Sequence, residues 1–189
     1  MKITNAMYLI SSTKVKKARR ALTEALPHFE QSEELIAEIL RDLPELEDRY
    51  FGTGEPILGG KKGYLVISGD KGLAGAYNQN VIRQGQQLMA EHPGTALYVV
   101  GEYGRRWFAQ RGVPVEKSFL YTAQNPTLDR ARHIAELLLD RFDAGEINSV
   151  WIIYTDMKNG LEATVHQAQV MPLHRERFHA ATAATAGDA

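Results

Sequence analysis

The first part of the chain carries hydrophobic side chains at alternating steps of three and four positions. Ile3, Met7 and Ile10 begin this stripe. A stripe this narrow is typical of a coiled-coil seam rather than of a helix that lies broadly on a sheet. A long helix is therefore predicted from residue 2 to about residue 43, within an N-terminal coiled-coil segment of residues 1–50. Pro27 predicts a kink or a short break in it, because an internal proline removes a helical hydrogen bond at a cost of about 3 kcal/mol.

A different pattern follows the glycine- and proline-rich residues 51–62, which we interpret as a linker. Residues 64–67 form a short apolar run of β-forming residues and predict a buried strand. Gly69, Gly72 and Gly75 come next, and a segment with helical periodicity follows them. The order strand, glycine turn, helix is typical of the first unit of an α/β domain.

Short apolar runs then alternate with helical segments along the rest of the chain. The predicted strands cover residues 96–100, 115–121, 150–154 and 163–173, and the predicted helices cover residues 103–110 and a segment that opens at residues 125–127. The turn signal Asn159-Gly160 predicts that the last strand pairs antiparallel. Residues 63–175 are thus predicted to be an α/β domain with a mixed, mostly parallel five-stranded sheet and helices on both faces. Residues 176–189 are predicted to be a flexible tail.

The composition narrows the class of protein. The chain has 189 residues, 44% of them hydrophobic, no cysteine and a formal net charge of −1. The near-neutral charge gives no general attraction to nucleic acid. The sequence contains no run of about 18 apolar residues, so we expect no direct membrane insertion and a chain that is soluble in isolation.

Charge is distributed unevenly along the predicted first helix. A group of cations, here called the basic cluster, precedes the acidic residues and consists of Lys14, Lys16, Lys17, Arg19 and Arg20. Such a run is often only a solvated helix face. It is equally compatible with a surface that meets an acidic partner, and the sequence leaves both interpretations open.

No catalytic, cofactor-binding or metal-binding constellation emerges from the sequence. The six histidines lack metal-site spacing, and zinc sites built on cysteine are excluded. Asp70 and Asp156 follow predicted strands, where α/β enzymes place catalytic groups, but turn formation and helix capping explain them more simply. The glycines of loop 69–75 could form an anion site, although the loop has neither dinucleotide-binding nor P-loop spacing. A nucleotide- or small-molecule-binding enzyme therefore remains the alternative hypothesis.

Two stretches resemble a known family. Residues 68–78, Ser-Gly-Asp-Lys-Gly-Leu-Ala-Gly-Ala-Tyr-Asn, are similar to the Ser-Asp-Arg-Gly-Leu-Cys-Gly-x-x-Asn signature of the gamma subunit of F-type ATP synthases. Residues 2–7, Lys-Ile-Thr-Asn-Ala-Met, are similar to the start of the same subunit. Lys71 and Ala74 stand where that signature usually has arginine and cysteine.

The resemblance implies a central-stalk, or rotor, subunit that transmits torque between ion flow, usually of protons, and ATP synthesis. It implies no active site and no cofactor in this chain. The implied partners are the alpha and beta subunits of the catalytic ring, the epsilon subunit, the membrane c-ring and a C-terminal helix that completes the coiled coil. By resemblance the chain is a fragment that lacks this helix and the start of the first one. The implied location is the cytoplasmic face of the cell membrane, as a peripheral part of the complex.

The resemblance also assigns candidate site residues. Those expected to contact partners lie on the first helix and are Ile3, Met7, Ile10, Lys14, Lys16, Lys17, Arg19 and Arg20. Those expected to form a structural motif loop are Asp70, Lys71, Gly72, Leu73, Gly75 and Asn78.

Overall fold

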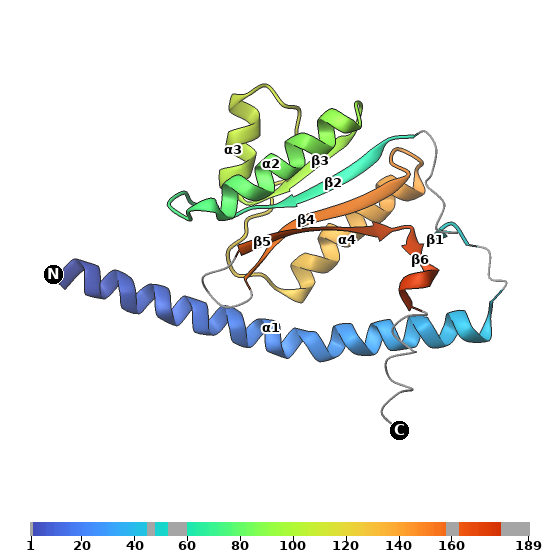
Figure 1. Cartoon of the computed structure of the whole chain (residues 1–189), viewed down its shortest axis with the longest axis horizontal. Helices are drawn as coiled ribbons and strands as arrows, with labels where there is room; N and C mark the ends of the chain where they lie inside the picture. The colour runs from blue at the N-terminus through green and yellow to red at the C-terminus, as the bar shows by residue number, and fades with distance from the viewer. Residues whose placement is uncertain (1, 45–47, 53–59, 158–162, 179–189) are drawn as a thin grey trace. The chain divides into compact units, whose positions relative to one another are not determined.

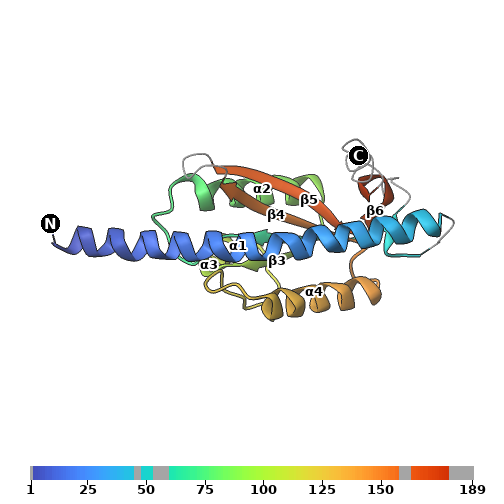
Figure 2. The same cartoon turned by 90° about the horizontal axis from the view of Figure 1, so that it is seen from below.

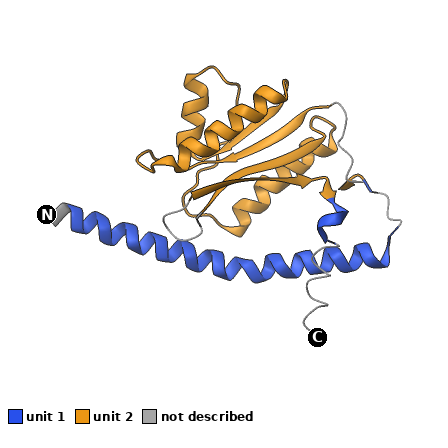
Figure 3. Ribbon diagram, in the orientation of Figure 1, with its two compact units in different colours: residues 1–48, 174–189 blue, residues 49–173 orange. Residues whose placement is uncertain are grey.

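The structure, a computed structural model, describes residues 2–44, 48–52, 60–157 and 163–178 (Figure 1). It divides into two compact units, which Figure 3 distinguishes by colour. Unit 1 comprises residues 1–48 and 174–189, and unit 2 comprises residues 49–173.

Unit 1 is dominated by one helix, α1 (Lys2–Asp42), which is 41 residues long. At 1.5 Å per residue this helix extends about 60 Å. The long helix predicted from the hydrophobic stripe is therefore confirmed. Pro27 lies inside it without a break, and the alternative expectation of a kink at Pro27 stays a prediction. The missing proline N–H leaves the carbonyl of Thr23 without its helical partner, and Thr23 lies on an exposed part of α1, where water can hydrate that carbonyl.

Burial along α1 is confined to its C-terminal part. Ala37 and Leu40 are buried, whereas Met7 is 65% exposed and Ile10 is 58% exposed. The chain returns to unit 1 at residues 175–178, which form a helical turn, and Phe178 there is only 3% exposed. The prediction therefore places the start of the flexible tail too early, because the buried ring of Phe178 holds this turn in place. Residues 179–189 lie outside the described residues.

The turn at residues 175–178 is also held to α1 by charged groups. The Arg177 guanidinium forms an ion pair with Glu33 and lies 6.0 Å from the ring centroid of Phe29. Arg175 donates a hydrogen bond of 2.9 Å to the carbonyl of Pro44. The C-terminal part of α1 therefore has tertiary contacts within unit 1.

This difference in packing predicts a gradient of amide exchange along α1. Residues 2–26 should exchange fast, because tertiary packing rather than intrinsic propensity stabilises most helices. Residues 33–42, which contain the buried positions, should exchange more slowly, and strand residues 64–67 should exchange most slowly. Hydrogen–deuterium exchange by mass spectrometry measures this gradient. Equal protection of residues 2–26 and 64–67 in a demonstrated monomer contradicts the prediction.

Unit 2 is built on a four-stranded sheet in the order β3-β2-β4-β5. The strands are β2 (Lys62–Ile67), β3 (Ala96–Val100), β4 (Ser149–Met157) and β5 (Ala163–Met171). β2 pairs parallel with both β3 and β4, and β5 pairs antiparallel with β4. The mixed, mostly parallel sheet with an antiparallel edge strand is confirmed. The predicted turn at Asn159-Gly160 lies outside the described residues.

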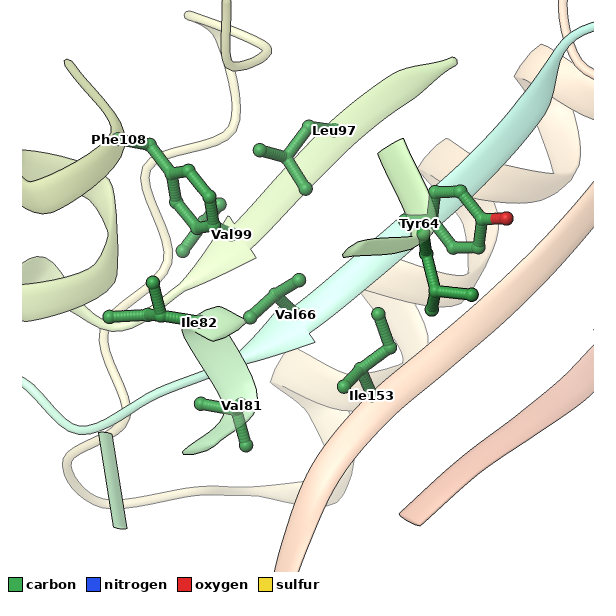
Figure 4. Packing of buried hydrophobic residues seen from close by; sticks show 9 residues of the cluster. Tyr64, Val66, Val81, Ile82, Leu97, Val99, Phe108 and Ile153 are labelled. Carbon is green, nitrogen blue, oxygen red and sulfur yellow. The ribbon is translucent and has the colours of Figure 1, made fainter. Parts of the chain in front are cut away.

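Helices cover both faces of this sheet, as predicted (Figures 1 and 2). α2 (Ala76–Glu91) and α3 (Glu102–Gln110) lie on one face, and α4 (Leu128–Asp143) lies on the other. Alternate strand residues point to opposite faces. Val66 and Val99 accordingly pack with Phe108 of α3 on the first face (Figure 4), whereas Leu65 belongs to the second core with Leu138 of α4.

The predicted strand at residues 115–121 is wrong. The segment is irregular, and only the Glu116 amide, which donates to the carbonyl of Leu97, reaches the backbone of the neighbouring strand β3. Phe119 is fully buried and its ring packs edge-on against Tyr98 at a centroid distance of 5.5 Å. The apolar residues that suggested a strand therefore fill the core beneath α4 instead of pairing, so the main sheet has four strands rather than five.

Two very short strands complete the described structure. β1 (Phe51–Gly52) lies within the predicted linker 51–62 and pairs with β6 (Leu173–His174). The linker also ends one residue earlier than predicted, because Lys62 already belongs to β2.

Candidate functional site

The glycine loop, residues 68–75, connects the end of β2 at Ile67 to the start of α2 at Ala76. β3 and β4 lie on opposite sides of β2, so the loop is at the point where the order of the sheet changes direction. Ligand sites of open α/β sheets often lie at such points. The contacts of the loop decide whether it is a ligand site or a structural motif.

Ser68 fixes the first part of the loop to β3 and α3. Its buried hydroxyl donates to the Val100 carbonyl at 3.1 Å and accepts from the Gly104 amide at 3.0 Å. This arrangement requires glycine at two neighbouring positions. A Cβ atom at Gly104 would lie 2.5 Å from the Ser68 hydroxyl oxygen, and one at Gly101 would lie 2.3 Å from the Ser68 carbonyl oxygen.

The Asp70 carboxylate joins three segments that are distant in the sequence. It accepts hydrogen bonds from the amides of Glu102 at 3.0 Å, Ala123 at 2.9 Å and Gln124 at 2.9 Å. Partial burial raises the pKa of Asp70, but these three donors and the nearby Arg105 guanidinium outweigh it, so its pKa is lower than usual. The carboxylate thus serves as an internal anion at the N-terminus of α3.

Asn78, on the first turn of α2, holds the other side of the loop. Its side chain is 2% exposed. The side-chain oxygen accepts from the Gly69 amide at 2.7 Å, and the side-chain nitrogen donates to the Lys71 carbonyl at 3.0 Å. Asp70 and Asn78 therefore both make structural hydrogen bonds, whereas Lys71, Gly72, Leu73 and Gly75 form the exposed part of the same loop.

The candidate partner-binding residues on α1 are accessible wherever the structure describes their side chains. Met7, Ile10 and all five members of the basic cluster are exposed. Arg20 forms an ion pair of 2.7 Å with Glu24 one turn later, with both side chains well exposed. The sequence interpretation overlooked this pair, although the spacing of four residues could have revealed it. The side chain of Ile3 is outside the described part.

Asp70 and Asp156, the two aspartates considered as candidate catalytic groups, lie in different segments of the described ranges. No cluster of three or more His, Asp or Glu side chains suited to a metal ion occurs there. Asp156, the second aspartate considered above, lies in β4 with its carboxylate 4.0 Å from the ring nitrogen of His166. None of the hydrogen bonds or ion pairs described above connects it with Asp70.

An apolar hollow of about 590 Å³ lies between α4 and the sheet in unit 2, and the sequence interpretation missed it. Its lining includes Ile67, Ile134, Leu138, Ile152 and Val170. The alternating apolar residues of β4 and β5 could have revealed it. They predict an apolar sheet face that is larger than α4 alone can cover.

Comparison with known proteins gives a consistent result. A family model described as ATP synthase matches residues 1–188. The ATP synthase gamma chain of Caldanaerobacter subterraneus subsp. tengcongensis is 42% identical over 179 residues, which cover 94% of this chain and 60% of that protein. The ATP synthase gamma chain of Ruminiclostridium cellulolyticum is 40% identical over 172 residues, which cover 90% of this chain and 58% of that protein.

The fold is also similar to a solved structure. A chain in the cryo-EM structure of the Tetrahymena thermophila mitochondrial ATP synthase central stalk and c-ring matches with a TM-score of 0.50 and 21% identity, over 81% of this chain and 71% of that one. At this identity the likeness concerns the fold alone.

The chain thus combines a long helix, an α/β unit and a glycine loop held by its own side chains. The family model matches nearly the whole of this sequence. The chain belongs to the ATP synthase family. Within that family it is similar to gamma chains, and it spans about 60% of the length of the relatives described above. Among the described residues, no helix combines the length and apolar character needed to span a bilayer.

Proposed function

We propose that the chain acts as a rotor subunit in the central stalk of a rotary ATP synthase, where it transmits torque and holds no active site. The observation that supports this most strongly is α1, a helix of 41 residues whose apolar side chains are exposed over most of its length. A long exposed stripe of this kind favours association with another helix. In the proposed role, a C-terminal helix of a complete gamma chain pairs with α1.

The remaining partners follow from the same role. The proposed partners are the alpha and beta subunits of the catalytic ring around the shaft, and the epsilon subunit and c-ring at its other end. The other subunits of the complex would hold this chain at the cytoplasmic face of the membrane. Ion flow through the membrane ring is the proposed source of torque.

The alternative hypothesis, a nucleotide- or small-molecule-binding enzyme, has no support among the relatives described above. The Asp70 carboxylate also places a negative charge at the N-terminus of α3, beside the glycine loop, and this charge would repel a phosphate. Titration of ATP, ADP and NAD against the isolated chain distinguishes the two functions. Submillimolar binding accompanied by turnover would favour the enzyme.

The basic cluster gives a test of the interface on α1. We define a hybrid gamma chain as the Caldanaerobacter relative in which the 179 matching residues are replaced by this chain. In the hybrid, Lys14, Lys16, Lys17, Arg19 and Arg20 are changed together to glutamine. Assembly with purified alpha and beta subunits, measured at low salt, should weaken about tenfold. Single exposed pairs contribute only about 0–1 kcal/mol each, so the summed field of the cluster carries the effect.

Salt provides the control for this prediction. At 1 M salt the Debye length falls to about 3 Å, so the difference between the hybrid and its fivefold variant should largely disappear. Helix content should be unchanged, because glutamine is nearly as good a helix former as lysine or arginine. Equal assembly of both proteins at low salt would mean that the basic cluster is merely a solvated face.

A further inference from the structure

The apolar hollow between α4 and the sheet has no role in the proposed function. Its volume of about 590 Å³ lies within the range of about 300–1,000 Å³ that is typical of small-molecule sites. All of the residues that line it belong to unit 2. The hollow is therefore a candidate ligand site on the α/β unit alone.

One end of the hollow lies where the parallel strands end. Ile67 is the last residue of β2 and Val100 is the last residue of β3, and both line the hollow. Ala123, Pro126 and Thr127, from the segment before α4, line it as well. Ligands of open α/β sheets bind outside the carboxyl ends of the strands, next to a change in strand order. The hollow reaches this position from the face of the sheet that α4 covers (Figure 1).

The interior of the hollow is apolar. Its lining includes Ile134 and Leu138 from α4, Ile152 from β4 and Val170 from β5. A water molecule in this interior would find few of the two to four polar partners that hold buried water. An alkyl chain fits such surroundings, and each CH₂ group that moves from water into them tightens binding about fourfold.

Arg130 supplies a positive charge at the rim of the hollow. Its Nη1 atom donates to the Gln124 carbonyl at 2.7 Å and lies 3.4 Å from the Thr122 carbonyl oxygen, and both of these acceptors are neutral. Within the described part of the chain, its Nε and Nη2 atoms make no hydrogen bond and its guanidinium forms no ion pair. The neighbouring Asp129 carboxylate lies 3.6 Å from His133 instead. A guanidinium with free donors favours a carboxylate ligand.

From these observations we infer that the hollow binds a free alkyl carboxylic acid of medium chain length. The alkyl chain occupies the apolar interior, and the carboxylate pairs with the Arg130 guanidinium. The ligand is the free acid rather than a membrane phospholipid, which would bring a second acyl chain and a phosphate to a hollow of about 590 Å³. This inference goes beyond the proposed function and does not depend on it.

The test is isothermal titration calorimetry of decanoate, octanoate and decanol against the isolated chain. Arg130→Gln removes the charge at the rim, and Val170→Trp fills the hollow. Arg132→Gln is the matched control, because Arg132 also lies on α4 but is exposed and does not line the hollow. Leu22→Gln controls for adventitious binding to α1, where Leu22 is 60% exposed.

We expect one decanoate to bind per chain, and octanoate, which is shorter by two CH₂ groups, to bind about 15-fold more weakly. Arg130→Gln should weaken decanoate binding about tenfold but change decanol binding by less than about twofold, because decanol carries no charge. Val170→Trp should weaken both ligands more than tenfold. Arg132→Gln and Leu22→Gln should leave both unchanged.

Three results with the isolated chain would overturn the inference. The first is an equal effect of Arg130→Gln on decanoate and decanol, which would make Arg130 a structural residue only. The second is unchanged decanoate binding in Val170→Trp, and the third is a loss in Leu22→Gln, which would place the ligand on α1. If Arg130→Gln fails to fold, as circular dichroism would show, Val170→Trp and the comparison with octanoate decide.

The hybrid gamma chain distinguishes this ligand from a helix that covers the hollow. The hybrid should bind decanoate within about threefold as tightly as the isolated chain. A hybrid that does not bind decanoate has the hollow covered by its own C-terminal part, which would overturn the inference. Displacement of decanoate by phosphatidylglycerol vesicles would likewise overturn the free acid as the ligand. Failure of the hybrid to assemble with alpha and beta subunits would refute the proposed function alone, because decanoate binding is measured without assembly.

Discussion

Replacing Gly101 with alanine should destabilise the chain by about 4 kcal/mol or prevent it from folding. Gly101 has a φ of +97°, and a Cβ atom there would lie 2.3 Å from the Ser68 carbonyl oxygen and 2.7 Å from the Gly69 carbonyl oxygen. The strained backbone and the overpacking each cost about 1–3 kcal/mol. Urea denaturation, followed by the fluorescence of Trp107 and Trp151, measures the loss.

Gly112 offers a matched control for this effect. It also has positive φ, at +68°, but a Cβ atom there would meet no other atom within 4 Å. Gly112→Ala should therefore cost only the conformational strain, about 1–2 kcal/mol. If the two alanine variants lose equal stability, the close approach of Gly101 to the Ser68 backbone is not what requires glycine there.

Replacing Asp70 with asparagine should destabilise the chain by about 2–3 kcal/mol at pH 7, because hydrogen bonds to a charged acceptor are lost and one amide donor then faces the asparagine NH₂ group. Asp70 has a lowered pKa in the folded chain. A carboxyl of this kind stabilises the fold above its unfolded pKa and loses that contribution as the pH falls through its folded pKa. The difference between Asp70→Asn and the unchanged chain should therefore be full at pH 7 and narrow below about pH 4.

Asp156 provides the comparison for this pH dependence. It also follows an apolar strand segment, but its side chain is 48% exposed and its carboxylate lies 4.0 Å from a ring nitrogen of His166. Asp156→Asn should change the free energy of unfolding by less than about 0.5 kcal/mol at either pH. A loss of stability in Asp70→Asn that stays constant from pH 7 to pH 3 would contradict the role of the ionised carboxylate.

The sequence predicted those elements whose periodicity is a direct consequence of burial. The stripe with steps of three and four located α1 to within a residue of its C-terminal end, and the apolar run at residues 64–67 located most of β2. The strand prediction at residues 115–121 failed because periodicity reports burial and not pairing. Phe119 and its neighbours are apolar because they fill the core next to Tyr98, and this requires no ladder of hydrogen bonds.

For a related reason, sequence patterns could not predict the tertiary contacts of the glycine loop. Capping was the expected role of Asp70, but the carboxylate lies at the start of α3, 32 residues away, rather than at the start of the helix that follows it. The need for glycine at position 104 likewise arises from the Ser68 hydroxyl. Such contacts depend on which strands become neighbours, and local propensity does not contain that information.

The most direct test of the central claim is rotation of this chain within a catalytic ring. Because this chain has no cysteine, a single cysteine introduced at the exposed position Lys117 gives the hybrid gamma chain one labelling site once any cysteine in the Caldanaerobacter segment has been changed to serine. The alpha–beta ring, immobilised on a surface, is supplied with ATP while the label is followed in single complexes. The account predicts stepwise rotation in one direction that stops when ATP is removed. A hybrid that remains stationary in a ring that hydrolyses ATP, or that does not enter the ring, would contradict it.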